Sequence, residues 1–287
     1  MSNFVEVNGS KIHFLDRDGG SPPLICLPGL TANAHFFDGL ISRGLSPRLR
    51  TIALDFRGRG LSDKPESGYE MAVYAADVHG VLDALGIEQA VICGHSFGAL
   101  VGFVLAAQDQ DKFPGLVIID SSHLLITART VQLVKASLDR LGVLLPSMEV
   151  YLDAIKQMPF LVGYWDNALE NYYRRDVETF ADGSVKPLTA PHAIAETIDH
   201  EFAEPWEKHI NKISQPVLLL NAPGPYGPAG TPPILTEKMA RETAAMFQEC
   251  DFQQVPGNHI TMLFGVNADF VMEAISSFVN QLTVTEG

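Results

Sequence analysis

Short runs of apolar residues alternate with longer amphipathic stretches along most of the 287-residue chain. Continuous apolar runs of four or five residues are typical of strands that are buried on both faces of a parallel sheet. The pattern predicts such strands at residues 24–27, 51–54, 90–93, 116–119 and 217–220, and a last strand is expected at residues 251–255. The spacing of apolar residues predicts helices at residues 70–85, 97–108, 236–247 and 266–282. Strands that alternate with helices in this way indicate an α/β fold with a mostly parallel sheet.

This alternation is preceded by a predicted hairpin and interrupted once. Residues 5–7 and 11–15 are expected to form two antiparallel strands, because Asn8-Gly9 between them is a hairpin turn signal. From residue 121 to about residue 212 the chain has amphipathic helical stretches and several aromatic residues, but no convincing strand. The simplest organisation is a core domain of residues 1–120 and 213–287, with residues 121–212 inserted as a helical cap.

Composition fits a folded domain and excludes several kinds of partner. Hydrophobic residues make up 46% of the chain and charged residues 19%, which is enough for a large core. Because the sequence has no run of eighteen apolar residues and no signal-like start, we expect neither a membrane span nor secretion. The net charge of -14 would repel a phosphate backbone, so nucleic acid is not an expected partner. Three cysteines are too few for a disulfide framework, which fits a cytoplasmic location.

The strongest chemical signal is Gly94-His95-Ser96-Phe97-Gly98, a G-x-S-x-G sequence. A predicted strand precedes it and a helix rich in small residues follows it, which is the setting of a nucleophile elbow. Glycine flanks the serine because a strained turn tolerates only minimal side chains. The dipole of the following helix would stabilise an oxyanion that forms beside its N-terminus. The alternative is a tight turn with a purely structural role.

Four motifs together resemble the α/β-hydrolase fold family, and the resemblance covers the whole chain outside the cap. They are Leu27-Pro28-Gly29-Leu30, the stretch from Asp55 to Ser62, Gly94 to Gly98, and Gly257-Asn258-His259. The resemblance implies a mostly parallel eight-stranded sheet flanked by helices, with the helical cap inserted. It also implies a branch similar to serine esterases and thioesterases, in which the acid follows the sixth strand.

By position in the family pattern, Ser96 is the expected nucleophile and His259 the expected base. The orienting acid departs from the commonest form, because the loop 221–228 contains no carboxylate. Asp120 stands instead at the carboxyl end of the strand beside the one that carries Ser96, and a carboxylate there can reach the histidine Nδ1. The alternative for Asp120 is a helix cap, in which case Glu237 is the first substitute to consider.

The remaining site residues are assigned from the same resemblance and from the composition of the cap. The backbone N–H groups of Leu30 and Phe97 are the expected oxyanion hole, although Pro28 replaces the usual histidine of that motif. His95 is expected to point away from the serine and to be structural. The aromatic residues of the cap are expected to line a substrate pocket or to attach the cap to the core. The candidate pocket residues are Tyr164, Trp165, Trp206 and His123.

These features predict a hydrolase that forms an acyl-enzyme with a small-molecule acyl substrate, and they specify no oligomeric state. A carboxylic ester or a lactone is the expected substrate, so the chain would be carboxylesterase-like. The alternatives are a thioesterase and a carbon–carbon bond hydrolase of ring-cleavage products. A ligand receptor with little turnover is a further alternative, because fold alone does not set function. No metal-ligand spacing or dinucleotide fingerprint is present, so no metal or other cofactor is expected.

Overall fold

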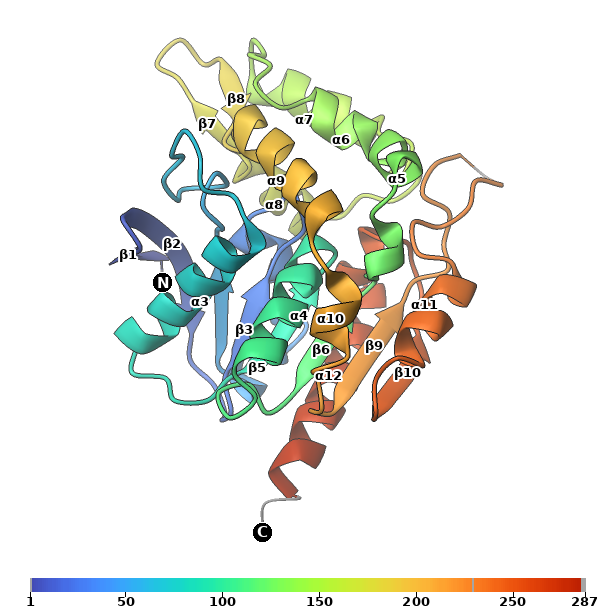
Figure 1. Ribbon diagram of the computed structural model, residues 1–287. Helices are drawn as coiled ribbons and strands as arrows, with labels where there is room; N and C mark the ends of the chain where they lie inside the picture. The colour runs from blue at the N-terminus through green and yellow to red at the C-terminus, as the bar shows by residue number, and fades with distance from the viewer. Residues whose placement is uncertain (1, 229, 285–287) are drawn as a thin grey trace.

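A computed structural model describes residues 2–228 and 230–284 of the protein. Its centre is an eight-stranded sheet with the strand order β1-β2-β4-β3-β5-β6-β9-β10 (Figure 1). The β1–β2 and β2–β4 pairs are antiparallel, and all the other pairs are parallel. The strands are β1 Ser2–Val7, β2 Ser10–Arg17, β3 Leu24–Leu27, β4 Thr51–Leu54, β5 Val91–His95, β6 Leu116–Ile119, β9 Val217–Asn221 and β10 Cys250–Gln254. The predicted mostly parallel eight-stranded sheet is therefore confirmed.

Helices cover both faces of this sheet. In Figure 1, α3, α4 and α10 lie in front of the sheet, and α12 lies behind it, where it packs against α1 and α2. The helices of the core are α1 Asp38–Ser42, α2 Leu45–Arg48, α3 Met71–Ala84, α4 Phe97–Gln108, α11 Glu237–Ala244 and α12 Asn267–Val284. Within the described residues, no helix combines the length and the apolar character that a membrane crossing requires.

The segment between β6 and β9 contains the inserted residues. Its helices are α5 Ala128–Leu133, α6 Lys135–Asp139, α7 Met148–Lys156, α8 Asn167–Arg174, α9 Pro191–Ala203 and α10 Trp206–Ile210. Figure 1 shows α5 to α9 above the carboxyl ends of the parallel strands. Helix α10 instead packs against α4 of the core, so the part that covers the sheet ends before α10. We call residues 121–204 the insertion from here on.

The insertion also contains two strands, so the expectation of no strand in this segment was wrong. Strand β7 Val177–Thr179 pairs with β8 Val185–Pro187 in a separate antiparallel sheet. Each strand has three residues, which is too short for an alternation of apolar and polar residues to stand out in the sequence. Val177 and Val185 are nevertheless buried, and Leu145 pairs with Val185 through an isolated bridge.

Candidate active site

Ser96 lies on a strained turn between β5 and α4. Its φ of 52° and ψ of -118° are in a region that residues other than glycine rarely adopt. The turn is held by hydrogen bonds from Ser96 N to Ile119 O at 3.1 Å and from Ser121 Oγ to Ser96 O at 2.8 Å. The strain therefore sets the serine at the N-terminus of α4, at the carboxyl edge of the sheet.

The two glycines of the G-x-S-x-G sequence are required by close backbone contacts. A Cβ atom on Gly98 would lie 2.0 Å from Leu27 O, and one on Gly94 would lie 2.5 Å from Ala99 N. Both separations are well below contact distance, so any side chain at either position would push α4 away from the sheet. The glycines thus allow α4 to start directly against β3 and β5.

His259 and Asp120 form a hydrogen-bonded pair at the same edge of the sheet. His259 Nδ1 lies 2.8 Å from Asp120 Oδ2, and both side chains are buried. Asp120 has a φ of 49°, which turns the chain sharply after β6 and directs its carboxylate across the sheet edge. His259 is in the loop after β10, where Gly257 has a φ of 100°. A buried carboxylate on Nδ1 fixes the imidazole orientation that a general base requires.

The end of β9 and the residue that follows it support this carboxylate instead of supplying one. Asp120 Oδ1 accepts a hydrogen bond from Ala222 N at 2.9 Å and another from Asn221 Nδ2 at 3.1 Å. Both Asp120 oxygens are therefore satisfied, Oδ2 by the imidazole and Oδ1 by Asn221 and Ala222. Glu237, the substitute considered from the sequence, is at the start of α11 and pairs with Arg241.

Two backbone N–H groups face the same region as the serine. Leu30 and Phe97 both line the cavity that contains Ser96, and neither N–H donates a hydrogen bond within residues 2–228 and 230–284. The Leu30 carbonyl is held by Arg59 Nε at 3.0 Å, which fixes the orientation of that peptide. Unpaired donors on a fixed backbone are what an oxyanion hole consists of.

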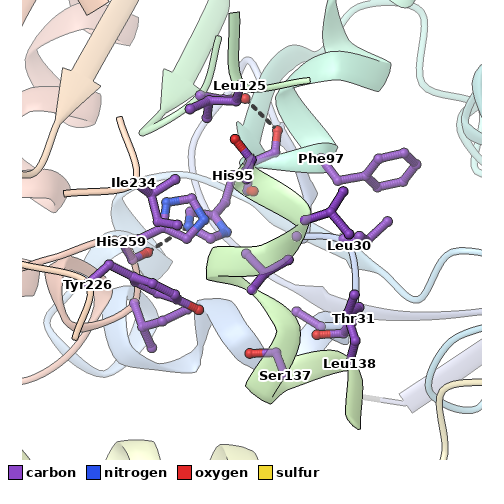
Figure 2. A pocket seen from close by; sticks show the side chains of 18 of the residues that line it. Leu30, Thr31, His95, Phe97, Leu125, Ser137, Leu138, Tyr226, Ile234 and His259 are labelled. Atoms are coloured by element: carbon purple, nitrogen blue, oxygen red, sulfur yellow. Dashed lines mark hydrogen bonds between the residues drawn. The ribbon is translucent and has the colours of Figure 1, made fainter. Parts of the chain in front are cut away.

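These groups open into one cavity of about 120 Å³, shown in Figure 2. A cavity of roughly 150 Å³ can hold a benzene molecule, so this volume suits a small substrate. Ser96, His259, Leu30 and Phe97 line it from the core. The insertion contributes apolar, hydroxyl and charged groups, among them Leu125, Thr130, Ser137, Arg140, Tyr172, Tyr173 and Glu201.

His95 does not point away from this cavity, which corrects the expectation from strand alternation. Its ring centroid is 4.5 Å from that of His259, and Figure 2 shows the two rings next to each other. His95 Nε2 donates to His259 O at 2.8 Å. Burial, together with the nearby His259, lowers the pKa of His95 well below its ordinary value, so the ring is neutral. The positive φ of Ser96 ends the strand alternation on which the expectation relied.

The four candidate pocket residues from the insertion and its surroundings do not line the cavity. Trp165 stacks on the outer side of Tyr173 and donates to Glu170 Oε2 at 3.0 Å. The Tyr164 hydroxyl lies beside Gly265 of the core. Trp206 is on α10 and donates to Glu201 O at 2.9 Å. His123 and Leu125 are on the same short turn, and only Leu125 lines the cavity. None of these side chains is therefore part of the cavity wall.

Tyr172 and Tyr173 of α8 line the cavity instead, and Arg140 is the positive charge in its wall. Arg140 Nη1 donates to the buried Asp176 carboxylate, which also accepts from the Tyr151 hydroxyl at 2.7 Å. Burial opposes the charged form of Arg140, but Asp176 outweighs this effect and raises the pKa of the guanidinium. The pattern of adjacent tyrosines on an amphipathic helix was visible in the sequence, whereas nothing in it distinguished Arg140.

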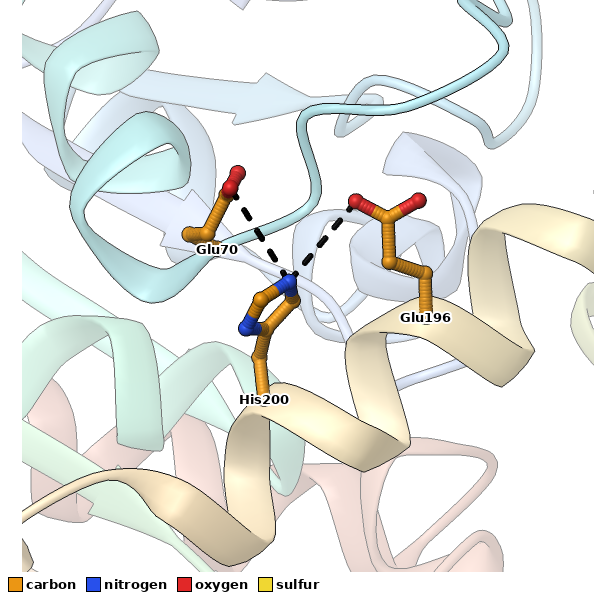
Figure 3. Close-up of side chains that lie close together, drawn as sticks. All are labelled: Glu70, Glu196 and His200. Atoms are coloured by element: carbon orange, nitrogen blue, oxygen red, sulfur yellow. Dashed lines mark ion pairs between the residues drawn. The ribbon is translucent and has the colours of Figure 1, made fainter.

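One group of potential metal ligands occurs among the described residues, and it is outside the cavity. Glu70, Glu196 and His200 have ligand atoms within 4.8 Å of one another (Figure 3). Glu196 Oε1 already accepts hydrogen bonds from the backbone N–H groups of Gly68 at 2.9 Å and Tyr69 at 3.1 Å. The group thus connects α9 of the insertion to the loop before α3 of the core.

The curated relatives that match this chain in sequence include a hydrolase and a deformylase. The 2-(acetamidomethylene)succinate hydrolase of Mesorhizobium japonicum is 35% identical over 186 residues, which are 63% of this chain and 64% of that protein. The N-formylmaleamate deformylase of Pseudomonas putida is 36% identical over 126 residues, 42% of this chain and 47% of that protein. The chain thus matches less than two thirds of the length of each relative.

Structural comparison extends the likeness over nearly the whole chain. The crystal structure of an E-2-(acetamidomethylene)succinate hydrolase superposes with a TM-score of 0.82 and 24% identity, and covers 98% of this chain and 99% of that one. At this identity the superposition shows a common fold. The family model of the α/β hydrolase fold matches residues 22–264, which include the elbow and both residues of the Asp120–His259 pair. The protein therefore belongs to the α/β hydrolase fold family.

Proposed function

We propose that this protein is a serine hydrolase that cleaves an acyl bond other than an ester in a small carboxylate substrate. The observation that carries the proposal is the combination, in one small cavity, of the Ser96 elbow, the Asp120–His259 pair and the buried Arg140. The relatives support the choice of bond, because neither is named for an ester. The relatives therefore favour the alternatives over the cleavage of an ester or a lactone. Hydrolysis of a carbon–carbon bond is one of these alternatives.

In the proposed mechanism, Ser96 Oγ attacks the carbonyl carbon of the substrate while His259 removes the hydroxyl proton. The N–H groups of Leu30 and Phe97 stabilise the oxyanion that forms. His259 then gives its proton to the leaving group, and the acyl group stays on Ser96 until water, activated by the same imidazole, releases it. Asp120 keeps His259 in the tautomer that can accept the serine proton.

Arg140 supports the proposal that the substrate is a carboxylate. The guanidinium has five N–H donors in a fixed fork, which suits bidentate binding of a carboxylate. Two donors of Nη1 go to Asp176 and Tyr151, and one of Nη2 goes to Thr31 O at 3.5 Å. The Nε–H and the second N–H of Nη2 have no hydrogen bond within the part of the chain that the structure describes. They are the donors that we assign to the substrate.

The names of the relatives suggest which carboxylates to try. Both contain an N-acyl group, acetamido in one and N-formyl in the other, on the skeleton of a dicarboxylic acid. We infer that a small N-acylated dicarboxylate is the best first substrate. Its acyl carbon would face Ser96 while a carboxylate contacts Arg140.

Two measurements test this proposal. A fluorophosphonate probe should label the wild-type protein rapidly and the Ser96→Ala variant not at all, whereas a receptor without turnover would be labelled slowly or not at all even with Ser96 present. A panel of matched N-acyl, ester, thioester and carbon–carbon substrates should then give the highest kcat/KM for the N-acyl dicarboxylate. A higher kcat/KM for an uncharged ester than for every carboxylate would overturn the proposal.

A further inference from the structure

A second ionisable group in the wall of the cavity has no role in the mechanism above. Glu201 is on α9, and with Ile198 and Phe202 it forms the face of that helix that lines the cavity. Spacings of three and four residues place these side chains next to one another on one side of a helix. The cavity therefore has a carboxyl group on α9 in addition to the guanidinium of Arg140.

The surroundings of Glu201 differ from those of the two other acids at the site. Asp120 accepts from His259, Asn221 and Ala222, and Asp176 accepts from Arg140 and Tyr151. The Glu201 carboxyl group has no hydrogen bond or ion pair within residues 2–228 and 230–284. A half-buried carboxyl without a partner, on a cavity wall, is free to bind whatever enters the cavity.

The cation that acts on Glu201, Arg59, does not offset the effect of its burial. Arg59 attracts the carboxylate, but its own donors go to Leu30 O, Arg57 O, the Tyr74 hydroxyl and Thr197 Oγ1. Burial outweighs this attraction and raises the pKa of Glu201 to about 8. From the core, Arg59 and Tyr74 are the charged and titratable groups near Glu201. The other such groups that line the cavity are His95, Arg140, Tyr172, Tyr173, Tyr226 and His259.

We propose that Glu201 is a specificity-determining residue, which in its neutral acid form donates a hydrogen bond to an oxygen of the carboxylate substrate. This inference rests on the proposed function. A neutral carboxylic acid does not repel a nearby anion, whereas an ionised carboxylate in the same place would repel it. Binding of the anionic substrate should therefore require the proton on Glu201, and the loss of this proton should weaken binding without changing the groups around Ser96.

The first test is the pH dependence of KM for a small N-acylated dicarboxylate, 2-(acetamidomethylene)succinate. If only the protonated enzyme binds, the apparent KM rises in proportion as the protonated fraction falls. For the wild type we expect a rise of about tenfold between pH 7 and pH 9, with kcat changed much less. Glu201→Gln keeps an N–H donor and cannot ionise, so its KM should stay within about twofold over the same range.

Asp199→Asn is the matched control, because Asp199 is an exposed carboxylate on the same helix. It should show the same rise in KM as the wild type. An equal rise in Glu201→Gln and in the wild type would overturn the inference, as would a flat profile in the wild type. Either result could occur while the substrate is still hydrolysed, so the proposed function would survive it.

A second test does not require turnover. In protein labelled with ¹³C at the glutamate carboxyl, one NMR resonance that is lost in Glu201→Gln should titrate with a midpoint near pH 8. Calorimetry on the Ser96→Ala variant should show succinate binding about tenfold more weakly at pH 9 than at pH 7. A midpoint between pH 4 and 5, or equal binding at both pH values, would refute the role of Glu201 even if no substrate is hydrolysed.

Discussion

The core and the insertion contribute to the same cavity in different ways. The groups arranged for bond cleavage come from the core, where Ser96, Asp120 and His259 each follow a strand of the same sheet. Their positions are fixed by the sheet, by two positive φ angles and by hydrogen bonds across the strand ends. The remoteness of these residues in the sequence does not matter, because parallel strands bring their carboxyl ends to one edge.

The insertion contributes groups that can recognise a substrate without reacting with it. Arg140, Tyr172, Tyr173 and Glu201 come from short helices and their connections, and all of them line the cavity. Their positions depend on how these helices pack on the core and on one another. The contrast suggests a division of labour, in which changes in the core alter the rate for every substrate and changes in the insertion alter the choice between substrates.

The largest expected effect is at the nucleophile and the base. Ser96→Ala and His259→Ala should each lower kcat by about 10⁴–10⁶, because the members of a triad act as one unit. The loss should be similar for every substrate that the wild type accepts, and it can be measured by steady-state kinetics. If Ser96→Ala kept more than a tenth of the wild-type kcat, the chemistry could not depend on the elbow.

Asp120→Asn should have the next largest effect, a fall in kcat of about 10³–10⁴. The amide can still accept from Ala222 N, so the fold should persist, but its NH₂ group would favour the wrong tautomer of His259. Circular dichroism would verify folding, and kcat on two unlike substrates would verify that the loss is uniform. A loss confined to one substrate would contradict the assignment of Asp120 to the core machinery.

The sequence predicted the core closely because strands buried on both faces give an unambiguous signal. Strands β3, β4 and β6 and helix α4 begin and end where the apolar pattern places them, and the other predicted core elements differ by a few residues. Asp120 could be found by elimination, since the loop after β9 offers no carboxylate. The sequence could not show that Asn221, the last residue of β9, donates to Asp120, because this contact depends on the register of two neighbouring strands.

The insertion was predicted poorly for a physical reason. Its helices and strands are short, and the side of each that faces the cavity is decided by packing against the core. Trp165 and Tyr173 illustrate this, because their rings stack at 6.0 Å and only Tyr173 lines the cavity. Composition could indicate that aromatic residues would gather in the insertion, but it could not show which of them line the cavity and which pack away from it.

Arg140→Lys should have a moderate effect that depends on the substrate. Lysine keeps the positive charge near Asp176 and loses the planar fork, so KM for a carboxylate substrate should rise about 10–100-fold, the cost of a hydrogen bond to a charged group. KM for an uncharged ester should change by less than about twofold. Equal changes for both substrates would show that Arg140 acts only on the structure of the insertion. Alanine is less suitable here, because it would leave the buried Asp176 carboxylate unpaired.

Glu201 should also affect stability, in a direction that its pKa determines. The folded state raises this pKa from 4.5 to about 8, so the folded state holds the proton more tightly than the unfolded state does. The resulting stability is fully present below about pH 4.5 and is lost as the pH rises through about 8. Relative to Glu201→Gln, the wild type should lose about 1–2 kcal/mol of unfolding free energy between pH 5 and pH 9, within the limit of about 1.4 kcal/mol per pH unit. Urea unfolding of both proteins at the two pH values measures this difference, and a constant difference would contradict the burial of the charge.

The smallest expected effect concerns the contact between the insertion and the core in Figure 3. His200 Nε2 is 3.9 Å from Glu70 Oε1 and 3.7 Å from Glu196 Oε1, and the His200 and Glu70 side chains are 36% and 48% exposed. Solvent screens such pairs, so His200→Ala should change the unfolding free energy by less than about 1 kcal/mol and leave kcat/KM unaltered.

Glu196→Ala is the informative comparison for this contact. It removes the acceptor of two backbone N–H groups of the core, at Gly68 and Tyr69, so it should cost more than His200→Ala, about 1–3 kcal/mol. Thermal unfolding of the two variants separates the contributions of the ion pairs and of the backbone hydrogen bonds. If His200→Ala were the more damaging change, the exposed ion pairs would hold the insertion on the core. Substrate selection by Arg140 and Glu201 would then depend on salt as well.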